Sequence, residues 1–188
     1  MARFKVQTAG TQEEEKETLE GAKRAVKIFI VLAFLVAAVL LIVPTPNIHV
    51  SLVTVSRSED YVTVTYHLVN TGYSFATNVV AYIPVDKTLV DKTPPYVYGS
   101  FSVVPSSEWG KIGFENLNSD VYSLLMFDIG WIPSRIISSG QRRFDIMINT
   151  GGEALITTIG KGKLVYSNMI GDTRETVINE FVVNVSSL

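Results

Sequence analysis

The side chains that could carry out acid–base or metal chemistry are few and scattered. The 188 residues include no cysteine and only two histidines, His49 and His67. Without cysteine, a thiol nucleophile, a thiolate zinc site, an iron–sulfur cluster and a disulfide framework are all excluded. Each histidine stands alone, one shortly after an apolar segment and the other on the polar side of an alternating run. We therefore interpret both as surface residues rather than catalytic bases.

No other motif predicts a reaction. Asp86, Asp91 and Asp120 lie in predicted loops, but a calcium site needs about six to eight oxygen ligands. The pairs Gly151-Gly152 and Gly160/Gly162 flank short strands and predict hairpin turns rather than a phosphate loop. Nucleophile-elbow, zinc-protease and EF-hand patterns are missing from the sequence. We expect no enzyme activity, no cofactor and no metal.

The charge balance argues against a nucleic-acid partner. The chain has 16 Lys and Arg against 18 Asp and Glu, a formal net charge of −2. Such a chain cannot neutralise a phosphate backbone by bulk charge.

One short pattern, Asn184-Val185-Ser186, is a possible glycosylation acceptor at Asn184.

One apolar segment stands out from the rest of the chain. Ile28 to Val43 reads IFIVLAFLVAAVLLIV, sixteen residues without a polar side chain. As a helix this run covers about 24 Å, and Ala25, Val26 and the stem of Lys27 bring it near the ~30 Å of a bilayer core. A buried helix of a soluble protein normally keeps a polar stripe. We predict a transmembrane helix over 25–43 with membrane lipid as its partner.

The flanks of this segment predict its orientation. Lys23, Arg24 and Lys27 stand at its amino-terminal end, whereas residues 44–47 carry no charge. Positive residues stay in the cytoplasm, so residues 1–24 should form a cytoplasmic tail and residues 44–188 an extracytoplasmic domain of a cell-membrane protein. Within the tail, Thr11 and Glu14 have capping-box spacing and predict a short acidic helix. This helix is either a solvated extension of the membrane helix or, less favoured, a coiled coil.

Two other interpretations of the apolar segment remain open. A cleaved secretory signal is disfavoured by the long acidic stretch before the segment and by the lack of a small-residue cleavage site after Val43. A pilin-type leader cut at Arg24–Ala25 would place the helix in a filament core, although Lys27 would then lie inside that core.

After Pro46 the pattern changes to alternating apolar and polar residues, which predicts strands. In residues 61–70 the even-numbered positions from Val62 to Leu68 are apolar, and in the next run the odd-numbered positions from Val79 to Val85 are apolar. The expected strands are Ile48–Ser56, Tyr61–Asn70, Asn78–Val85, Tyr98–Val104, Val121–Ile129, Arg142–Asn149, Ala154–Ile159, Lys163–Asn168 and Thr173–Val185. This spacing is typical of an antiparallel β-sandwich that folds without metal or disulfide.

Two stretches carry a resemblance to a known class of domain. VTVTYHLVNTGYSFATNVVAYIPVD (Val62–Asp86) and IISSGQRRFDIMI (Ile136–Ile148) together resemble the adhesion-type immunoglobulin-like modules of archaeal and bacterial surface proteins. Those modules share a strand ending in Asn-Thr-Gly, an acidic turn after the next strand, and a Gly that opens a later strand. The resemblance covers about forty residues and implies an extracytoplasmic immunoglobulin-like sandwich, mainly β, with no implication for a ligand.

The turn at 70–72 also has a physical interpretation. Asn70 tolerates the left-handed region and Gly72 accepts a positive φ, so the chain can leave one strand and cross the sandwich.

A proline-rich stretch between two expected strands carries several aromatic residues. Proline cannot donate to a strand ladder, so Pro94, Pro95 and Pro105 predict an edge or a long loop. The aromatic side chains either close one end of the core, which we favour, or form a protein-binding surface. They are Tyr96, Tyr98, Phe101 and Trp109.

These observations predict a single-pass envelope protein whose β-sandwich makes protein–protein contacts as a structural or accessory subunit of a membrane or surface assembly. The alternative is a pilin-like or archaeal filament-associated subunit, because the layout is also similar to accessory subunits of the archaeal swimming filament. A solute-binding receptor domain is the least favoured hypothesis, since it would need a pocket with convergent polar groups.

Overall fold

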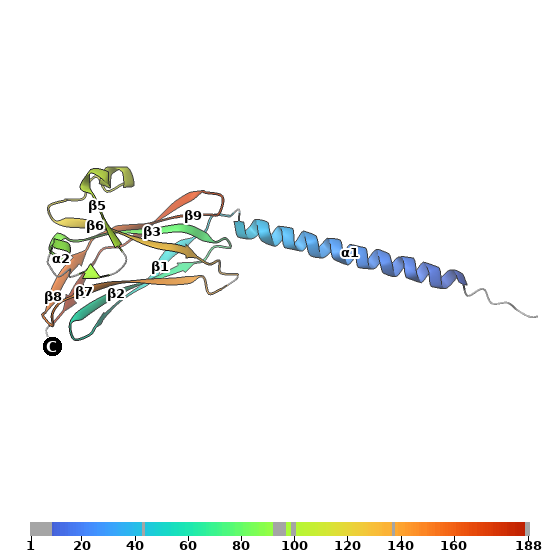
Figure 1. Cartoon of the computed structure of the whole chain (residues 1–188), viewed down its shortest axis with the longest axis horizontal. Coiled ribbons are helices and arrows are strands. Elements are labelled where there is room, and N and C mark those ends of the chain that lie inside the picture. Colours follow the sequence, from blue (N-terminus) through green and yellow to red (C-terminus); the bar gives the residue numbers. More distant parts are fainter. Residues whose placement is uncertain (1–8, 43, 92–96, 99–100, 137, 187–188) are drawn as a thin grey trace, which may run out of the picture. The chain divides into compact units, whose positions relative to one another are not determined.

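The computed structural model describes residues 9–42, 44–91, 97–98, 101–136 and 138–186 (Figure 1). The chain divides into two compact units, residues 1–40 and residues 41–188, which we call the helical unit and the β domain.

The helical unit is built on one continuous helix, α1 (Ala9–Ile42). The expected acidic helix and the expected apolar helix are therefore parts of a single element, which begins at Ala9 rather than at the predicted cap residue Thr11. Over the part of the chain that the structure describes, no helix is both long and apolar enough to cross a membrane. The helix itself is thus confirmed, and its placement in a membrane stays a prediction.

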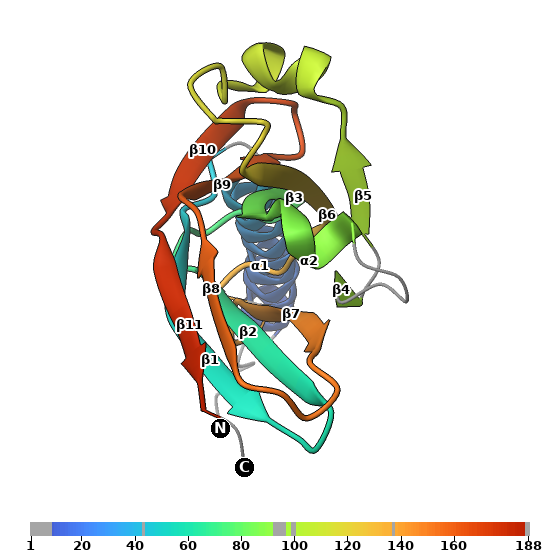
Figure 2. The same ribbon diagram turned by 90° about the vertical axis from the view of Figure 1, so that its left-hand side faces the viewer.

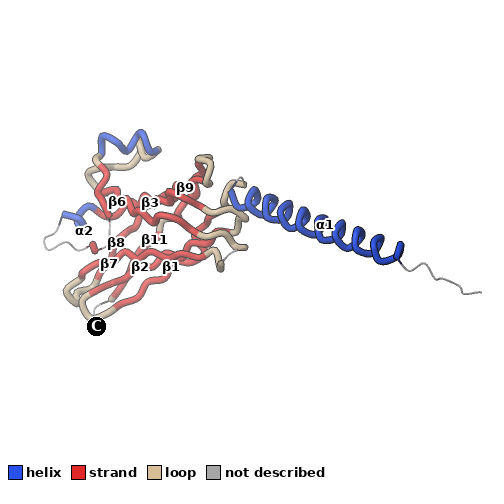
Figure 3. Tube along the Cα trace, turned by 45° about the vertical axis from the view of Figure 1, so that its right-hand side comes forward, coloured by secondary structure: helices blue, strands red, loops and turns tan. Residues whose placement is uncertain are grey.

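The β domain contains two antiparallel sheets (Figures 2 and 3). The first has four strands in the order β1 (Ile48–Arg57), β2 (Tyr61–Asn70), β7 (Gln141–Asn149) and β4 (Val97–Tyr98). The second has the order β10 (Thr173–Ile178), β9 (Gly162–Ser167), β3 (Ala76–Asp86), β6 (Tyr122–Ile132) and β5 (Phe101–Val104), and it includes β11 (Phe181–Val185) paired with β8 (Leu155–Ile159). Two short helices, α2 (Lys87–Asp91) and the 3-10 helix η1 (Ser106–Ile112), lie in the connections.

The alternation seen in the sequence correctly predicts the core. The apolar faces of β2 and β3 are buried, from Val62 to Leu68 and from Val79 to Val85, and both belong to one apolar cluster. Because β2 and β3 are in different sheets, this shared cluster means that the two sheets face each other across a common core. The predicted mainly-β, antiparallel architecture is confirmed.

A bulge sets the inward side of β1. Val50 lies opposite Leu68, but the register then shifts, so that Val53 lies opposite Tyr66 and Val55 opposite Val64. The extra residue moves the odd-numbered valines after the bulge onto the core side, which a strict two-residue period would have turned outward.

The carboxy-terminal strands form one long, bent ribbon. The β9–β10 register, Ser167 with Thr173 to Gly162 with Ile178, continues in β8–β11 from Ile159 with Phe181. Gly160–Gly162 is therefore a bend in this ribbon, and the predicted hairpin there is wrong. A Cβ on Gly162 would lie 2.5 Å from the Tyr82 carbonyl oxygen, so glycine is needed where the ribbon crosses β3.

The bend also interrupts the run Thr173–Val185, which the sequence predicted as one strand. It is divided between β10 and β11, and the break shifts the buried face to Ile178 while Val177 is exposed.

Tyr66 places a hydroxyl in the apolar core without a hydrogen-bond partner in the structure. Its ring stacks on Phe144, and burial raises the pKa of the Tyr66 phenol because the phenolate would lose its hydration. Removing an unpartnered buried hydroxyl removes a desolvation penalty.

We predict that Tyr66→Phe raises the free energy of unfolding by about 1 kcal/mol. Urea unfolding of the full chain measures the change. Wild-type stability should also fall as the pH rises above about 10, where the unfolded phenol ionises and the folded one does not, and the variant should lose this part of the alkaline effect. A variant at least 1 kcal/mol less stable than the wild type would show that the hydroxyl has a favourable partner.

Candidate functional site

The predicted topology residues lie on the surface of the helical unit. Lys23, Arg24 and Lys27 are exposed on α1, on the amino-terminal side of the apolar stretch. The apolar side chains that follow are also exposed, and they include Ile28, Phe29, Val31, Phe34 and Leu35.

The predicted aromatic surface does not form as a group. Trp109 is 95% buried because η1 folds it against Val104 and Leu124, and its indole Nε1 donates to the Val104 carbonyl at 2.9 Å. Phe101 is half-buried in β5, 6.0 Å from Phe127 between ring centroids. Trp109 thus fills a small second core on the outer side of β6, whereas the burial interpretation had placed these rings at one end of the main core. Tyr96 lies outside the described residues, and Tyr98 pairs with Met147 through the backbone of β4.

The remaining candidates do not assemble into a reactive site. His49 is exposed and His67 is half-buried, and both lie on the outer side of the first sheet. Asn184, the possible glycosylation site, is exposed on β11. Among the described residues, no three His, Asp or Glu side chains are grouped so that they could hold a metal ion.

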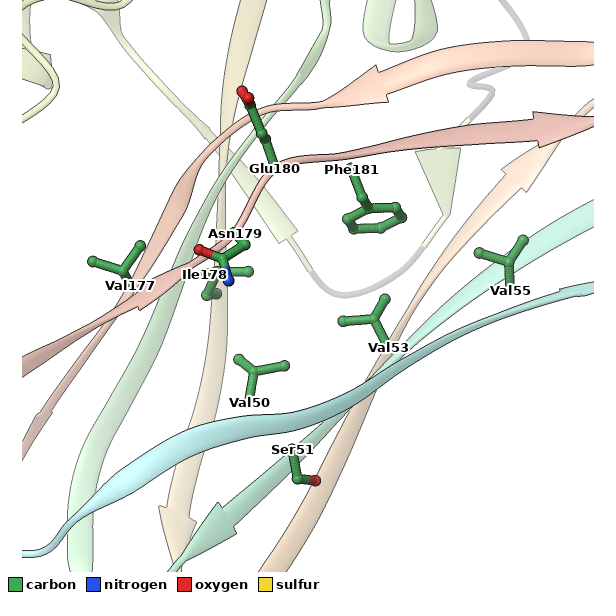
Figure 4. Close-up of a pocket in the computed structure, with 9 residues that line it drawn as sticks. All are labelled: Val50, Ser51, Val53, Val55, Val177, Ile178, Asn179, Glu180 and Phe181. Atoms are coloured by element: carbon green, nitrogen blue, oxygen red, sulfur yellow. The ribbon is translucent and has the colours of Figure 1, made fainter.

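A groove of about 340 Å³ opens between β1 and the β10–β11 bend (Figure 4). Val50, Val53 and Val55 face Ile178 and Phe181 across it. Beside the groove the two sheets are joined at the start of β1, where the Ile48 N–H donates to the Tyr166 hydroxyl and the Ile48 carbonyl accepts from the Thr176 hydroxyl at 2.6 Å.

A second hollow of about 540 Å³ lies between the η1 region and the β9–β10 ribbon. Two of its charged side chains are paired with each other. Lys163 forms an ion pair of 3.0 Å with Glu175, and its ammonium lies 5.7 Å from the centroid of the Phe114 ring. A receptor pocket needs polar groups that converge on a ligand, and this ion pair already engages two of the charged groups in the hollow.

The side chain of Asn70, at the end of β2, makes four hydrogen bonds. It is fully buried. Its Oδ1 accepts from the N–H groups of Asn47 at 3.2 Å and Gly72 at 3.0 Å. Its Nδ2 donates to the carbonyls of Ser74 at 2.8 Å and Pro133 at 3.2 Å. All four hydrogen-bonding positions of the amide are used.

Asn70 therefore joins the start of β1, the β2–β3 loop and the β6–β7 loop. We call this end of the β domain, where the chain arrives from α1, the proximal end, and the opposite end the distal end. Two glycines allow the close packing. A Cβ on Gly140 would lie 2.6 Å from the Asn70 carbonyl oxygen, and one on Gly72 would lie 2.8 Å from the Asn47 nitrogen.

The predicted backbone geometry of the turn at residues 70–72 was wrong. Neither Asn70 nor Gly72 has a positive φ, whereas Asn78, in the bulge of β3, has a φ of 50°. Asn70 and Gly72 are needed for hydrogen bonding and space rather than for left-handed backbone. The sequence did contain a signal for this, because Asn70 continues the inward period of Val62, Val64, Tyr66 and Leu68.

In comparisons with known proteins, neither a protein-family model nor a curated protein matches the chain.

We predict that Asn70→Ala lowers the free energy of unfolding by about 3 kcal/mol, because it leaves several buried N–H and carbonyl groups unpaired. Asn149→Ala is the matched control. Asn149 also ends a strand and accepts from an N–H two residues later, that of Gly151, but at an exposed position, so its loss should cost less than about 1 kcal/mol. Equal losses in chemical unfolding would contradict the assigned role of Asn70.

Proposed function

We propose that the chain is a single-pass envelope protein. Helix α1 anchors it in a membrane with the amino terminus in the cytoplasm. The β domain, an immunoglobulin-like sandwich, lies outside and makes protein contacts as a subunit of a membrane or surface assembly.

The observation that carries this proposal is the all-round exposure of apolar side chains on α1. Successive helical residues point about 100° apart. The five consecutive residues Ile28 to Leu32 are each between 51% and 72% exposed, so every side of the helix is apolar and uncovered. A helix that is apolar all round needs an apolar surrounding, and a lipid bilayer provides one.

The length of the apolar run is compatible with anchoring. The described side chains of this run end at Leu40, while the sequence stays apolar through Val43. The sixteen residues cover about 24 Å, and the aliphatic stems of Lys27 and Arg24 can extend the embedded part by snorkelling. A bilayer can also thin locally around a short span.

The strand order supports an immunoglobulin-like β domain. In that fold one sheet contains strands A, B and E and the other C, F and G. Here β1-β2-β7 forms one sheet, and β3-β9-β10 are neighbours in the other, all antiparallel. With β1 as A, β2 as B, β3 as C, β7 as E, β9 as F and β10 as G, the two orders agree.

The free edge of β1 supports a protein contact. In the described structure β1 pairs only with β2, so the main-chain groups on its other side are open to an added strand from Val50 to Val55. The adjoining apolar groove would receive alternate side chains of an extended segment of a partner protein.

Helix anchoring is tested with two substitutions at equally exposed leucines of α1. Leu35 lies in the apolar run and is 59% exposed, and Leu19 lies in the charged part and is 57% exposed. We predict that Leu35→Lys reduces the fraction of the full chain that floats with lipid vesicles several-fold, because a charge at the bilayer centre costs about 3 kcal/mol. Leu19→Lys should have no effect. Equal flotation of the two variants would contradict the anchor.

Protease protection on oriented vesicles tests the orientation, and the native amino-terminal mass separates the anchor from the filament alternative. Residues beyond Pro46 should be digested from outside, with the amino terminus intact and protected. A start at Ala25 would favour the pilin-type filament instead.

The β1 contact predicts a site-specific cross-link in native membranes. A photoreactive residue at Val55, which lines the groove, should give a discrete protein adduct. The same residue at Val182, which is 61% exposed on β11, should not. Identical adduct patterns from both positions would argue against the β1 edge as the contact.

A further inference from the structure

Three loops meet at the proximal end of the β domain. They join β2 to β3 (71–75), β6 to β7 (133–140) and β9 to β10 (168–172). The strand register places them together, because Ile48 at the start of β1 pairs with Asn70, and Thr77 near the start of β3 pairs with Ser167. Asn70 fixes two of the loops by hydrogen bonds, as described above.

Large apolar side chains in and beside these loops are exposed to solvent. Five of the twelve exposed large apolar side chains described in the β domain lie here, including both aromatic ones. They are Tyr73, Trp131, Ile136, Met169 and Ile170, each more than half exposed. Exposed apolar residues gathered at one end, with Trp and Tyr among them, are typical of protein surfaces that contact a membrane interface.

The tip of the β9–β10 loop is held in place by its own hydrogen bonds. The side-chain Oδ1 of Asn168 accepts from the N–H groups of Ile170 at 3.2 Å and Asp172 at 2.8 Å. The Thr77 hydroxyl donates to the Asn168 carbonyl at 3.1 Å and so ties the loop to β3. Met169 and Ile170 are therefore presented at a fixed turn.

Charge is distributed unequally between the two ends. At the proximal end the described loops and the first three residues of the strands that follow them carry four arginines and two acidic residues: Arg135, Arg142, Arg143, Arg174, Asp172 and Glu175. The described distal turns and adjoining residues carry five acidic and two basic side chains: Glu59, Asp60, Asp86, Asp120, Glu153, Arg57 and Lys87. The basic end complements an anionic surface, and the Arg142 guanidinium lies 5.7 Å from the centroid of the Trp131 ring.

The connection from α1 limits how far the proximal end can be from the lipid. Five residues, 43–47, separate α1 from β1. Fully extended, five residues reach roughly 18 Å. If α1 is embedded, the proximal end cannot leave the vicinity of the bilayer surface, whatever the angle between the two units.

We propose that the proximal end is a second lipid-binding site, in which the loop residues Tyr73, Met169 and Ile170 and the adjoining Trp131 of β6 enter the headgroup region of an anionic bilayer and the arginines contact lipid phosphates. The inference rests on the proposed anchoring by α1. A bilayer is favoured over a protein as the occupant because the apolar tips, the arginines and the short connection all belong to the same end.

Single cysteines test this in the full chain, which has no native cysteine. Ile170→Cys and Ile156→Cys are matched, since both isoleucines are exposed, and Ile156 lies on β8 away from the proximal end. Each variant carries a nitroxide label and is reconstituted in phosphatidylcholine vesicles with or without phosphatidylglycerol. With phosphatidylglycerol, collision of the label at 170 with a water-soluble nickel complex should fall several-fold, and that at 156 should not change.

The arginine contribution is measured in the same vesicles. Arg135→Ser and Arg174→Ser should each weaken the contact seen by the label at 170 by roughly fivefold, whereas Lys87→Ser at the distal end should not. A label at 170 that stays water-accessible while the chain floats with the vesicles overturns this inference and leaves the α1 anchor standing. A chain that does not float at all overturns the anchor and this inference together. Equal protection at 170 and 156 overturns the assignment of the proximal end.

Discussion

The architecture of the β domain depends on one buried side chain, the amide of Asn70. Its four hydrogen bonds connect the point where the chain reaches β1 with two loops that are far away in sequence. A buried amide with all four positions satisfied is favourable, and one with any position unmatched is expensive. This requirement fixes two of the three loops at the proximal end relative to the strands. It also explains the two neighbouring glycines, since a Cβ on either would collide with the backbone that Asn70 holds in place.

The two units of the chain differ in whether their apolar side chains are buried or exposed. In the β domain, apolar side chains of both sheets bury one another, and a 3-10 helix covers the additional apolar residues on the outside of β6. In α1, apolar side chains are exposed on every side, so contacts within the described chain do not bury them. The β domain is therefore self-sufficient in burying its apolar residues, whereas α1 is not.

The sequence predicted the strands well because their inward faces obey a two-residue period over long stretches, as in Val62 to Leu68 and Val79 to Val85. It failed where that period is interrupted. The bulge in β1 and the bend at Gly160–Gly162 depend on which strand lies alongside, and neither is encoded in a local pattern. Trp109 illustrates the same limit. The residues around Trp109 in the sequence were compatible with an exposed or a buried position. Only the fold of η1 places Trp109 in the second core. The candidate site was less predictable than the strands, because the proximal end brings together residues from four separate segments of the chain. Its one local signal was that Asn70 lies on the same face of its strand as Val62 to Leu68.

The central claim is that α1 requires an apolar surrounding. Its most direct test is the solution state of the full-length chain purified without detergent, measured by size-exclusion chromatography with light scattering. We expect that no monodisperse species at the monomer mass of 20.7 kDa is obtained, and that added detergent or lipid produces one with bound amphiphile. A stable 20.7 kDa monomer that binds neither detergent nor vesicles would contradict the account.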